Sequence, residues 1–240
     1  TRKQNCKFAD GRQDIYMKRS EINKIMQDAL DFMKEMKYVA PPFVYWTPKD
    51  WENKGSEYDE VRDCMLGWDI TDFGSGDFHK CGLLMITMRN GVKQSDTYFK
   101  PYAEKVLIVE EGQVTPFHFH WSKMEDIINR GGGNLMVQLY NRTDDEKLAD
   151  TPVLAMVDGR RFTVPAGTIL TIKPGESITL PPGQYHKFWA EGGRLFIVEV
   201  SSVNDDNTDN RFLDAPARFP EIEEDEEPLH LLFNEYPPAK

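Results

Sequence analysis

The sequence predicts a mainly β fold with one helix near the N-terminus and further helical or irregular segments at the periphery. Short strand-like runs alternate with glycine and proline from about residue 105 to residue 202, and no helical periodicity interrupts them. An amphipathic run precedes them. Short strands separated by turn residues are typical of a closed barrel or of two packed sheets.

The predicted helix begins after Ser20, which is a suitable N-cap residue. Apolar side chains then recur at helical spacing and form one packing face, and Pro41 and Pro42 would end the helix. The residues of this face are Ile22, Ile25, Met26, Ala29, Leu30, Met33 and Met36.

The segment before this helix, residues 1–16, is polar and has no periodicity, and Met17 looks like a natural start. We expect residues 1–16 to be an N-terminal extension or a cloning remnant, and residues 17–240 to form a single domain. Residues 46–76 show no clear period and predict an irregular lid or edge. A β run then ends in the turn Asn90-Gly91.

Eight further runs predict strands, each bounded by turn residues. They are KVLIVEEGQ, FHFHW, NLMVQLY, RFTVPAG, TILTIKPG, SITLPPGQ, HKFWAEGG and RLFIVEVS.

Charge and cysteine content narrow the class of protein. The net charge of −11 argues against nucleic acid or an anionic membrane as partner, because either needs a basic surface. A small neutral ligand fits better. The cysteines Cys6, Cys64 and Cys81 are odd in number and lack a C-x-x-C spacing, so no disulfide framework is predicted. With no apolar leader or spanning segment in view, we expect a reduced, cytoplasmic protein.

Two histidines stand one residue apart in a chain that has five. Residues i and i+2 of a strand face the same side, so His118 and His120 would present adjacent imidazoles. H-x-H alone fits a half-exposed strand with incidental histidines equally well. Glu125, which follows beyond a turn, can fold back beside the pair and add an oxygen ligand.

A second unit lies downstream, where a Pro-Gly turn at Pro181-x-Gly183 precedes His186. A third imidazole from a separate strand would complete a set of three nitrogens and one carboxylate. Mn²⁺, Fe²⁺, Co²⁺, Ni²⁺ and Zn²⁺ all tolerate this set. The sequence therefore predicts a divalent metal held by His118, His120, Glu125 and His186.

These two units resemble the two motifs of the cupin family. The first, G-x5-H-x-H-x4-E-x6-G, is complete from Gly112 to Gly132. The second, G-x5-P-x-G-x2-H from Gly175, departs at its last position, where Ala190 replaces the usual asparagine. The resemblance implies a jelly-roll barrel with a divalent metal inside.

A longer resemblance, from about residue 17 to about residue 238, is to the D-lyxose isomerase family. It is carried by MKRSEIN, AEKVLIVEEGQVTPFHFHWSKMEDIINRGGG and EVSSVNDDNTDNRF. It implies reversible aldose–ketose isomerisation, of D-lyxose with D-xylulose and of D-mannose with D-fructose, with Mn²⁺ as the usual metal. We further expect a homodimer whose only other partner is the sugar.

Three charged residues are candidates for catalysis. Lys105 opens the strand before the first motif, and the resemblance implies a contact with a sugar oxygen, although a surface lysine at a strand end is the alternative. Glu199 shares a strand face with apolar neighbours, which indicates a partner or a function unless that face is exposed. Glu221 is a further candidate base, although it begins an acidic run.

Asp209 and Arg211 lie on the loop that leaves the strand of Glu199. Similar loops in related sugar-isomerising cupins reach over the barrel mouth, so these residues are candidate sugar contacts. The alternative is a solvated polar loop.

Two other functions share the same metal ligands. One is a cupin dioxygenase that uses Fe²⁺ and O₂, and the other is a non-catalytic sugar-binding or sensing cupin. A lysine and carboxylates beside the metal favour the isomerase, which must move protons between carbons and oxygens. No helix-turn-helix is evident, and the acidic charge disfavours a DNA-linked sensor.

Overall fold

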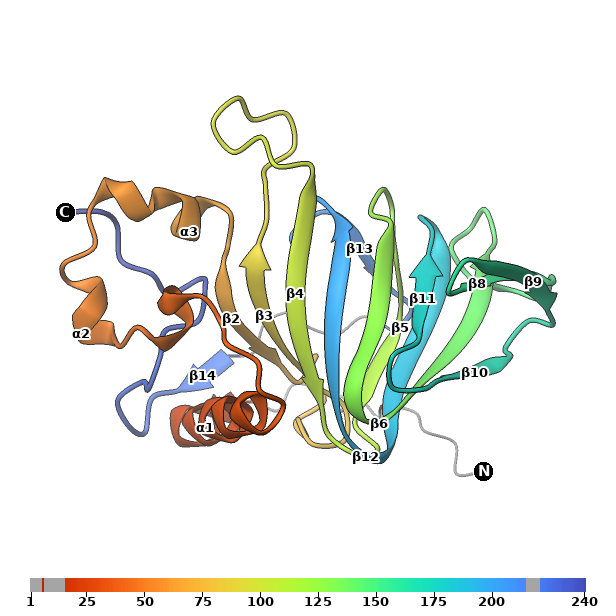
Figure 1. The fold of residues 1–240 in the computed structure, drawn as a ribbon, viewed down its shortest axis with the longest axis horizontal. Helices are drawn as coiled ribbons and strands as arrows, with labels where there is room; N and C mark the ends of the chain where they lie inside the picture. The colour runs from red at the N-terminus through yellow and green to blue at the C-terminus, as the bar shows by residue number, and fades with distance from the viewer. Residues whose placement is uncertain (1–5, 7–15, 215–220) are drawn as a thin grey trace.

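The computed structural model describes residues 6, 16–214 and 221–240. The order of elements is one N-terminal helix, a group of short helical turns and then a body of antiparallel strands (Figure 1). The helical elements are α1 (Arg19–Glu35), η1 (Pro42–Tyr45), α2 (Pro48–Trp51), η2 (Ser56–Tyr58) and α3 (Asp59–Asp63), of which η1 and η2 are 3-10 turns. Within the described ranges, no helix is both long and apolar enough to cross a membrane.

The strands form a large sheet and a small one. The large sheet contains β2 (Gly67–Thr71), β3 (Leu83–Arg89), β4 (Tyr102–Val109), β5 (Val114–His120), β6 (Glu125–Arg142), β7 (Leu148–Ala149), β8 (Val153–Val157), β9 (Arg160–Val164), β10 (Ile169–Ile172), β11 (Ser177–Leu180), β12 (Gln184–Ser202) and β13 (Asn210–Phe212). The small sheet pairs β1 (Tyr16–Lys18) with β14 (Glu221–Glu223).

Two long strands give the large sheet its shape. The sheet runs in the order β2-β3-β4-β12-β6-β11-β8-β9, and β5, β7, β10 and β13 pair off this path. The C-terminal half of β12 pairs with β4, whereas its N-terminal half pairs with β5. Likewise, β6 pairs with β11 near its start and with β10 near its end. Each long strand therefore belongs to both layers of a folded-over, jelly-roll sheet.

Glycines allow the bends in these two strands. A Cβ at Gly132 would lie 1.9 Å from the carbonyl oxygen of Arg194, and one at Gly133 would lie 2.4 Å from that of Gly193. The pairing of β6 with β12 shifts register at the same place. The prediction that glycine separates short strands is therefore wrong here, because the chain passes through the bend and continues as one strand.

Two of the three apolar clusters lie on opposite sides of β4. Val106 and Ile108 face outward and pack against α1, whereas Leu107 faces inward between the two layers. Strand alternation therefore sends Lys105 inward as well, where it is 2 % exposed. This places Lys105 in the interior and excludes its alternative as a surface residue.

Helix α1 differs from the prediction at both ends. Its N-cap is Lys18 rather than Ser20, whose backbone N–H and hydroxyl donate to Asp225 in the C-terminal segment. The helix ends at Glu35, and Lys37, with φ of 56°, turns the chain well before Pro41. The predicted irregular segment 46–76 holds short helices but also the edge strand β2, which sequence reasoning missed.

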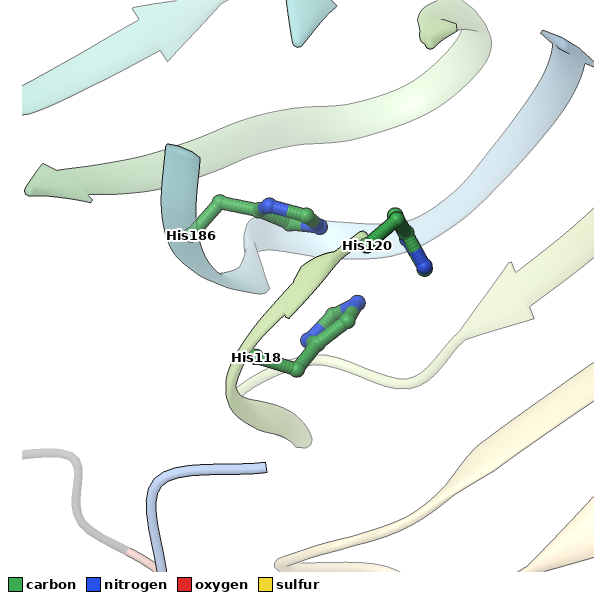
Figure 2. Close-up of side chains that lie close together, drawn as sticks. All are labelled: His118, His120 and His186. Carbon is green, nitrogen blue, oxygen red and sulfur yellow. The ribbon is translucent and has the colours of Figure 1, made fainter. Parts of the chain in front are cut away.

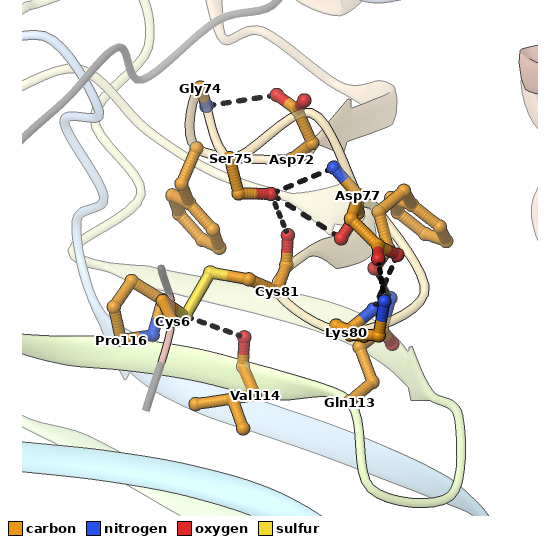
Figure 3. The surroundings of a disulfide bond; sticks show 12 residues. Cys6, Asp72, Gly74, Ser75, Asp77, Lys80, Cys81, Gln113, Val114 and Pro116 are labelled. Carbon is orange, nitrogen blue, oxygen red and sulfur yellow. Dashed lines mark hydrogen bonds and ion pairs between the residues drawn. A yellow bond between two sulfur atoms is a disulfide. The ribbon is translucent and has the colours of Figure 1, made fainter. Parts of the chain in front are cut away.

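A disulfide joins Cys6 to Cys81, which lies just before β3 (Figure 3). The prediction of no disulfide is therefore wrong: the odd count is explained by Cys64, which is buried and free. The bridge spans 75 residues of sequence and ties residue 6 to the side of the sheet near Val114. Apart from Cys6 and Tyr16, the predicted extension 1–16 lies outside the described residues.

Candidate active site

The three predicted histidines lie together between the layers of the folded sheet (Figure 2). His118 and His120 come from β5, and His186 comes from β12, where it pairs directly opposite His118. The imidazole centroids of His118 and His186 are 4.1 Å apart. One nitrogen from each of the three rings can be chosen so that all lie within 4.8 Å of one another.

Backbone carbonyls fix the tautomer of each ring. The Nδ1 atoms of His118, His120 and His186 lie 2.9, 3.2 and 3.0 Å from carbonyl oxygens. Because a carbonyl oxygen only accepts, each Nδ1 carries the proton and each Nε2 presents a lone pair. Burial also lowers the pKa of His118 and His120, which keeps both rings neutral. The carbonyls belong to Pro116, Asp209 and Gln184.

The Nε2 atoms face a carboxylate. Oε1 of Glu125 is 3.1 Å from Nε2 of His186 and 3.4 Å from Nε2 of His120. Both nitrogens are buried and have no hydrogen-bond partner among the described residues. Neutral lone pairs and an anionic oxygen at these distances repel one another unless a cation joins them. The predicted set of His118, His120, His186 and Glu125 therefore fits a divalent metal.

A row of alternating charges continues from Glu125. Its other oxygen is 2.6 Å from Nζ of Lys123, which is also 2.9 Å from Glu199. Glu199 lies opposite Lys105 in the β12–β4 pairing, with Oε1 3.3 Å from Nζ. All four side chains are nearly inaccessible to solvent. The structure thus brings Lys105 and Glu199 into one charged row with Glu125, beside the imidazoles.

Three members of the row have shifted pKa values. Burial would raise the pKa of Glu125, but the ammonium of Lys123 lowers it well below its ordinary value. Burial opposes the charge on Lys123 too, yet Glu125 and Glu199 together raise its pKa. For Lys105, burial prevails and lowers the pKa despite Glu199. Lys105 is therefore the member whose proton is most easily released.

Sequence reasoning missed Lys123. It stands two residues before Glu125, inside the first motif, where it looked like part of a polar turn. A lysine so close to a metal-binding carboxylate is a usable signal, because the shared strand end brings both side chains to one place.

The two predicted sugar contacts face elsewhere. Arg211 donates to Glu146 at 2.6 Å on the far side of β13, away from the cavity. Asp209 accepts from the backbone N–H and the hydroxyl of Ser122 and from Lys93, while its carbonyl oxygen holds His120. Asp209 therefore orients the imidazole of His120, and neither side chain lines the cavity.

Other residues of the same loop do reach the cavity. Asp206 and Asn210 line it, and Asn204 lies behind them. The amide oxygen of Asn204 accepts from Lys105 at 2.5 Å, while its nitrogen donates to Asp206 at 2.7 Å. A lysine only donates and a carboxylate only accepts, so the amide orientation is fixed and Asn204 positions both groups.

Glu221 is not brought to this site. It lies exposed on β14, where it pairs with Tyr16 of β1 beside α1 (Figure 1). The acidic run therefore matches its solvated alternative in this structure, and the catalytic role of Glu221 stays a prediction.

The cavity is polar at the charged row and apolar elsewhere. The apolar side chains that line it are Phe73, Leu83, Met85, Leu107, Ile127, Phe188 and Phe212.

Comparison with known proteins decides which family this site belongs to. The family model described as D-lyxose isomerase matches residues 17–236. The chain belongs to the D-lyxose isomerase family. It is 48 % identical over 223 residues to the D-lyxose/D-mannose isomerase of Serratia proteamaculans, covering 92 % of this chain and 98 % of that protein. The protein of the same name from Escherichia coli O157:H7 matches with the same identity and coverage.

Solved structures of sugar isomerases share the fold of this chain. The L-ribose isomerase of Cellulomonas parahominis with L-psicose superposes with a TM-score of 0.59 at 16 % identity, covering 88 % of this chain and all of that one. The L-ribose isomerase of Acinetobacter sp. DL28 with L-ribose gives 0.58 at 14 % identity, covering 87 % and 99 %.

As a member of the D-lyxose isomerase family, the protein is an aldose–ketose isomerase of sugars. The isomerase prediction is thereby confirmed over the dioxygenase and the non-catalytic cupin.

Proposed function

We propose that the protein interconverts D-lyxose with D-xylulose and D-mannose with D-fructose, with Mn²⁺ held by His118, His120, His186 and Glu125. The observation that carries the proposal is the set of unpartnered Nε2 lone pairs beside Glu125, in the same cavity as Lys105 and Glu199. The names of the two relatives at 48 % identity support the choice of sugars.

The exchange moves one hydrogen between C1 and C2 and one proton between O1 and O2. A divalent cation bound here would supply Lewis-acid stabilisation of the charge that develops on the sugar oxygens. Lys105 donates a hydrogen bond to one of these oxygens and moves the proton between them. Its lowered pKa suits this task, because proton transfer is most effective when the pKa of the group approaches the working pH.

Glu199 is the carboxylate that we assign to carbon. It takes the proton from C2 of the aldose and returns it to C1, so that the ketose forms without net change in charge. Lys105 and Lys123 hold its position from two sides. Glu221 is the alternative base, and a Glu221→Gln variant of unchanged activity would remove it.

Incubation with Mn²⁺ and a panel of aldoses under argon tests the function. We expect ketose from D-lyxose and D-mannose at the same rate as in air, since no oxidant takes part. D-Mannose deuterated at C2 should lose label to water. Oxygen consumption without ketose would contradict the proposal. Full retention of the deuterium label would indicate a hydride shift between C2 and C1, and Glu199 would then not be the base.

Two further parts of the proposal concern the state of the protein. We propose a homodimer, which sedimentation equilibrium of the purified protein tests.

We also propose a cytoplasmic location. The Cys6–Cys81 disulfide argues against it, because that compartment keeps most thiols reduced. Thiol alkylation in freshly lysed cells decides: free Cys6 and Cys81 support the cytoplasm, and a bridged pair contradicts it.

A further inference from the structure

One polar atom in the cavity has no role in the reaction described above. The hydroxyl oxygen of Thr115 is buried and has no hydrogen-bond partner among the described residues. The side chain is 1 % exposed and lines the cavity. The Nε2 atoms of His120 and His186, which are also unpartnered among the described residues, are those that the proposed metal would bind.

A β-bulge turns Thr115 toward the cavity. His118 faces the cavity from the same strand, and strict alternation would place a residue three positions away on the opposite face. In the β5–β12 pairing, however, His118 lies opposite His186 while Thr115 lies opposite Phe188. Three steps on β5 match two on β12, so the extra residue brings both side chains to one face.

The surroundings of Thr115 at the cavity offer the hydroxyl no acceptor. Phe188 is its direct cross-strand neighbour, and the lining away from the charged row is apolar. Valine has the same shape as threonine and would fill the position without a polar atom. An unsatisfied buried hydroxyl costs free energy that valine would avoid. A ligand that hydrogen-bonds to Thr115 when it enters the cavity accounts for the hydroxyl.

The distance along β5 suggests which part of a sugar Thr115 meets. Three residues of strand span roughly 10 Å. With C1 and C2 near the imidazoles, the carbons toward the other end of an open-chain sugar extend along β5. A hexose is longer than a pentose by one carbon–carbon bond, about 1.5 Å. The hydroxyls at this end distinguish one aldose from another.

We propose that Thr115 determines sugar specificity by hydrogen-bonding, through its hydroxyl, to a sugar hydroxyl remote from C1 and C2. This inference rests on the proposed function and extends it to the distal end of the sugar. Thr115 does not touch the reacting carbons, so its contribution is to binding and selection among aldoses.

Thr115→Val tests the proposal, with Thr115→Ser as the variant that keeps the hydroxyl. We expect Thr115→Val to lower kcat/KM for D-lyxose or D-mannose roughly 5- to 100-fold, because a sugar hydroxyl is left unpaired. Thr115→Ser should retain most activity. Thr179→Val, at a half-buried position of β11 outside the cavity, is the control and should be unchanged. Equal kcat/KM for Thr115→Val and the parent on every sugar would overturn the proposal.

Deoxy sugars identify the contacted hydroxyl. With D-mannose deoxygenated singly at C3, C4, C5 or C6, and with D-lyxose deoxygenated singly at C3, C4 or C5, one analogue of a sugar should erase the difference between Thr115→Val and the parent. A difference that persists at full size with every analogue would mean that the substitution acts on the fold, and the proposal would fail.

Stability gives a readout that does not depend on turnover. Because the hydroxyl has no protein partner, Thr115→Val should leave Tm of the sugar-free protein unchanged or raise it. A clear fall in Tm would show a structural hydrogen bond and would overturn the proposal.

If the parent converts no aldose, the proposed function fails. Calorimetric binding of D-mannitol to the Mn²⁺-loaded parent and to Thr115→Val then decides whether Thr115 contacts a sugar. Weaker binding by the variant supports the role of Thr115, and equal binding contradicts it.

Discussion

The imidazole cluster of His118, His120 and His186 and the charged row of Lys123, Glu199 and Lys105 lie side by side, yet they differ in one respect. In the cluster, the Nε2 atoms that face Glu125 have no partner within the described chain. In the row, each charge is met by an opposite charge within 3.3 Å. The Nε2 atoms of the cluster need a bound cation as their partner, whereas the charges of the row neutralise one another within the protein. Substitutions in the two regions should therefore fail in different ways.

The largest effect is expected in the cluster. His120→Ala should lower activity by a factor of at least 10³, because the proposed site would lose one of its ligands and with it the Lewis acid that a bound cation would supply. Metal content after dialysis, measured by atomic emission, should fall with activity. Tm of the metal-free variant should fall moderately, because the substitution removes a buried ring and its Nδ1–H bond to the Asp209 carbonyl, whereas the lost Nε2 had no partner among the described residues. Metal content equal to that of the parent would break the comparison.

Glu199→Gln should lower kcat by about 10²- to 10⁴-fold, the usual contribution of a proton-transferring group. Metal content should remain near that of the parent, since Glu199 is not among the ligands. Steady-state rates with D-mannose, together with metal analysis, check this. If metal content and rate fall by the same factor, Glu199 instead acts structurally, by holding Glu125 in place through Lys123.

Lys123→Met probes the completeness of the row. It leaves the buried carboxylates of Glu125 and Glu199 without their common cation, which should cost about 3–5 kcal/mol of unfolding free energy. Denaturant melts of the metal-free protein measure this cost. Lys80→Met is the matched control, because Lys80 is exposed and its ion pair with Asp77 lies at the surface. Its effect should stay below about 1 kcal/mol.

Acid should affect the row through Glu125. The folded state lowers the pKa of Glu125 well below its ordinary value of 4.5, so its contribution to stability is present above that pH. That contribution is lost as pH falls below 4.5 through the folded pKa. Metal-free melts between pH 7 and pH 3 should show the decline, and Glu125→Gln should flatten it. An equal decline in Glu125→Gln would assign it to other carboxylates.

The smallest effect is expected at Arg211. Arg211→Gln removes an ion pair with Glu146 on the side of β13 away from the cavity, at a side chain about one-third exposed. Activity should change less than about threefold, and stability by less than about 1 kcal/mol. A loss of more than tenfold in kcat/KM would instead support the predicted role of Arg211 as a sugar contact.

The difference between the two regions also explains what sequence could predict. The imidazole cluster was predictable because two short motifs fix the spacing of its histidines, and strand alternation makes His118 and His120 neighbours. The prediction of Glu199 rested on a charged residue in an apolar strand, whereas that of Lys105 rested on its proximity to the first motif and on the family resemblance. Their pairing depends on the register of β4 against β12, which pattern alone does not supply.

The loop after β12 escaped prediction for a related reason. Asp206 and Asn210 line the cavity while Asp209 and Arg211 do not, and all four are polar residues of one short stretch. Which of them turns inward depends on Asn204 and on the pairing of β13 with β5. Thr115 depends likewise on a bulge. The overall jelly roll was predictable, but its glycine bends looked like the ends of strands.

Those bends have a mechanical consequence. Because β6 and β12 each run through both layers, the layers are joined by covalent chain as well as by hydrogen bonds. The two layers therefore cannot separate to admit a sugar. We expect entry and exit at the rim, past the segment 203–212, three of whose side chains (Asp206, Asn210 and Phe212) line the cavity. Amide hydrogens in the middle of β6 and β12 should therefore exchange last, and those of segment 203–212 should exchange early and become protected when sugar binds.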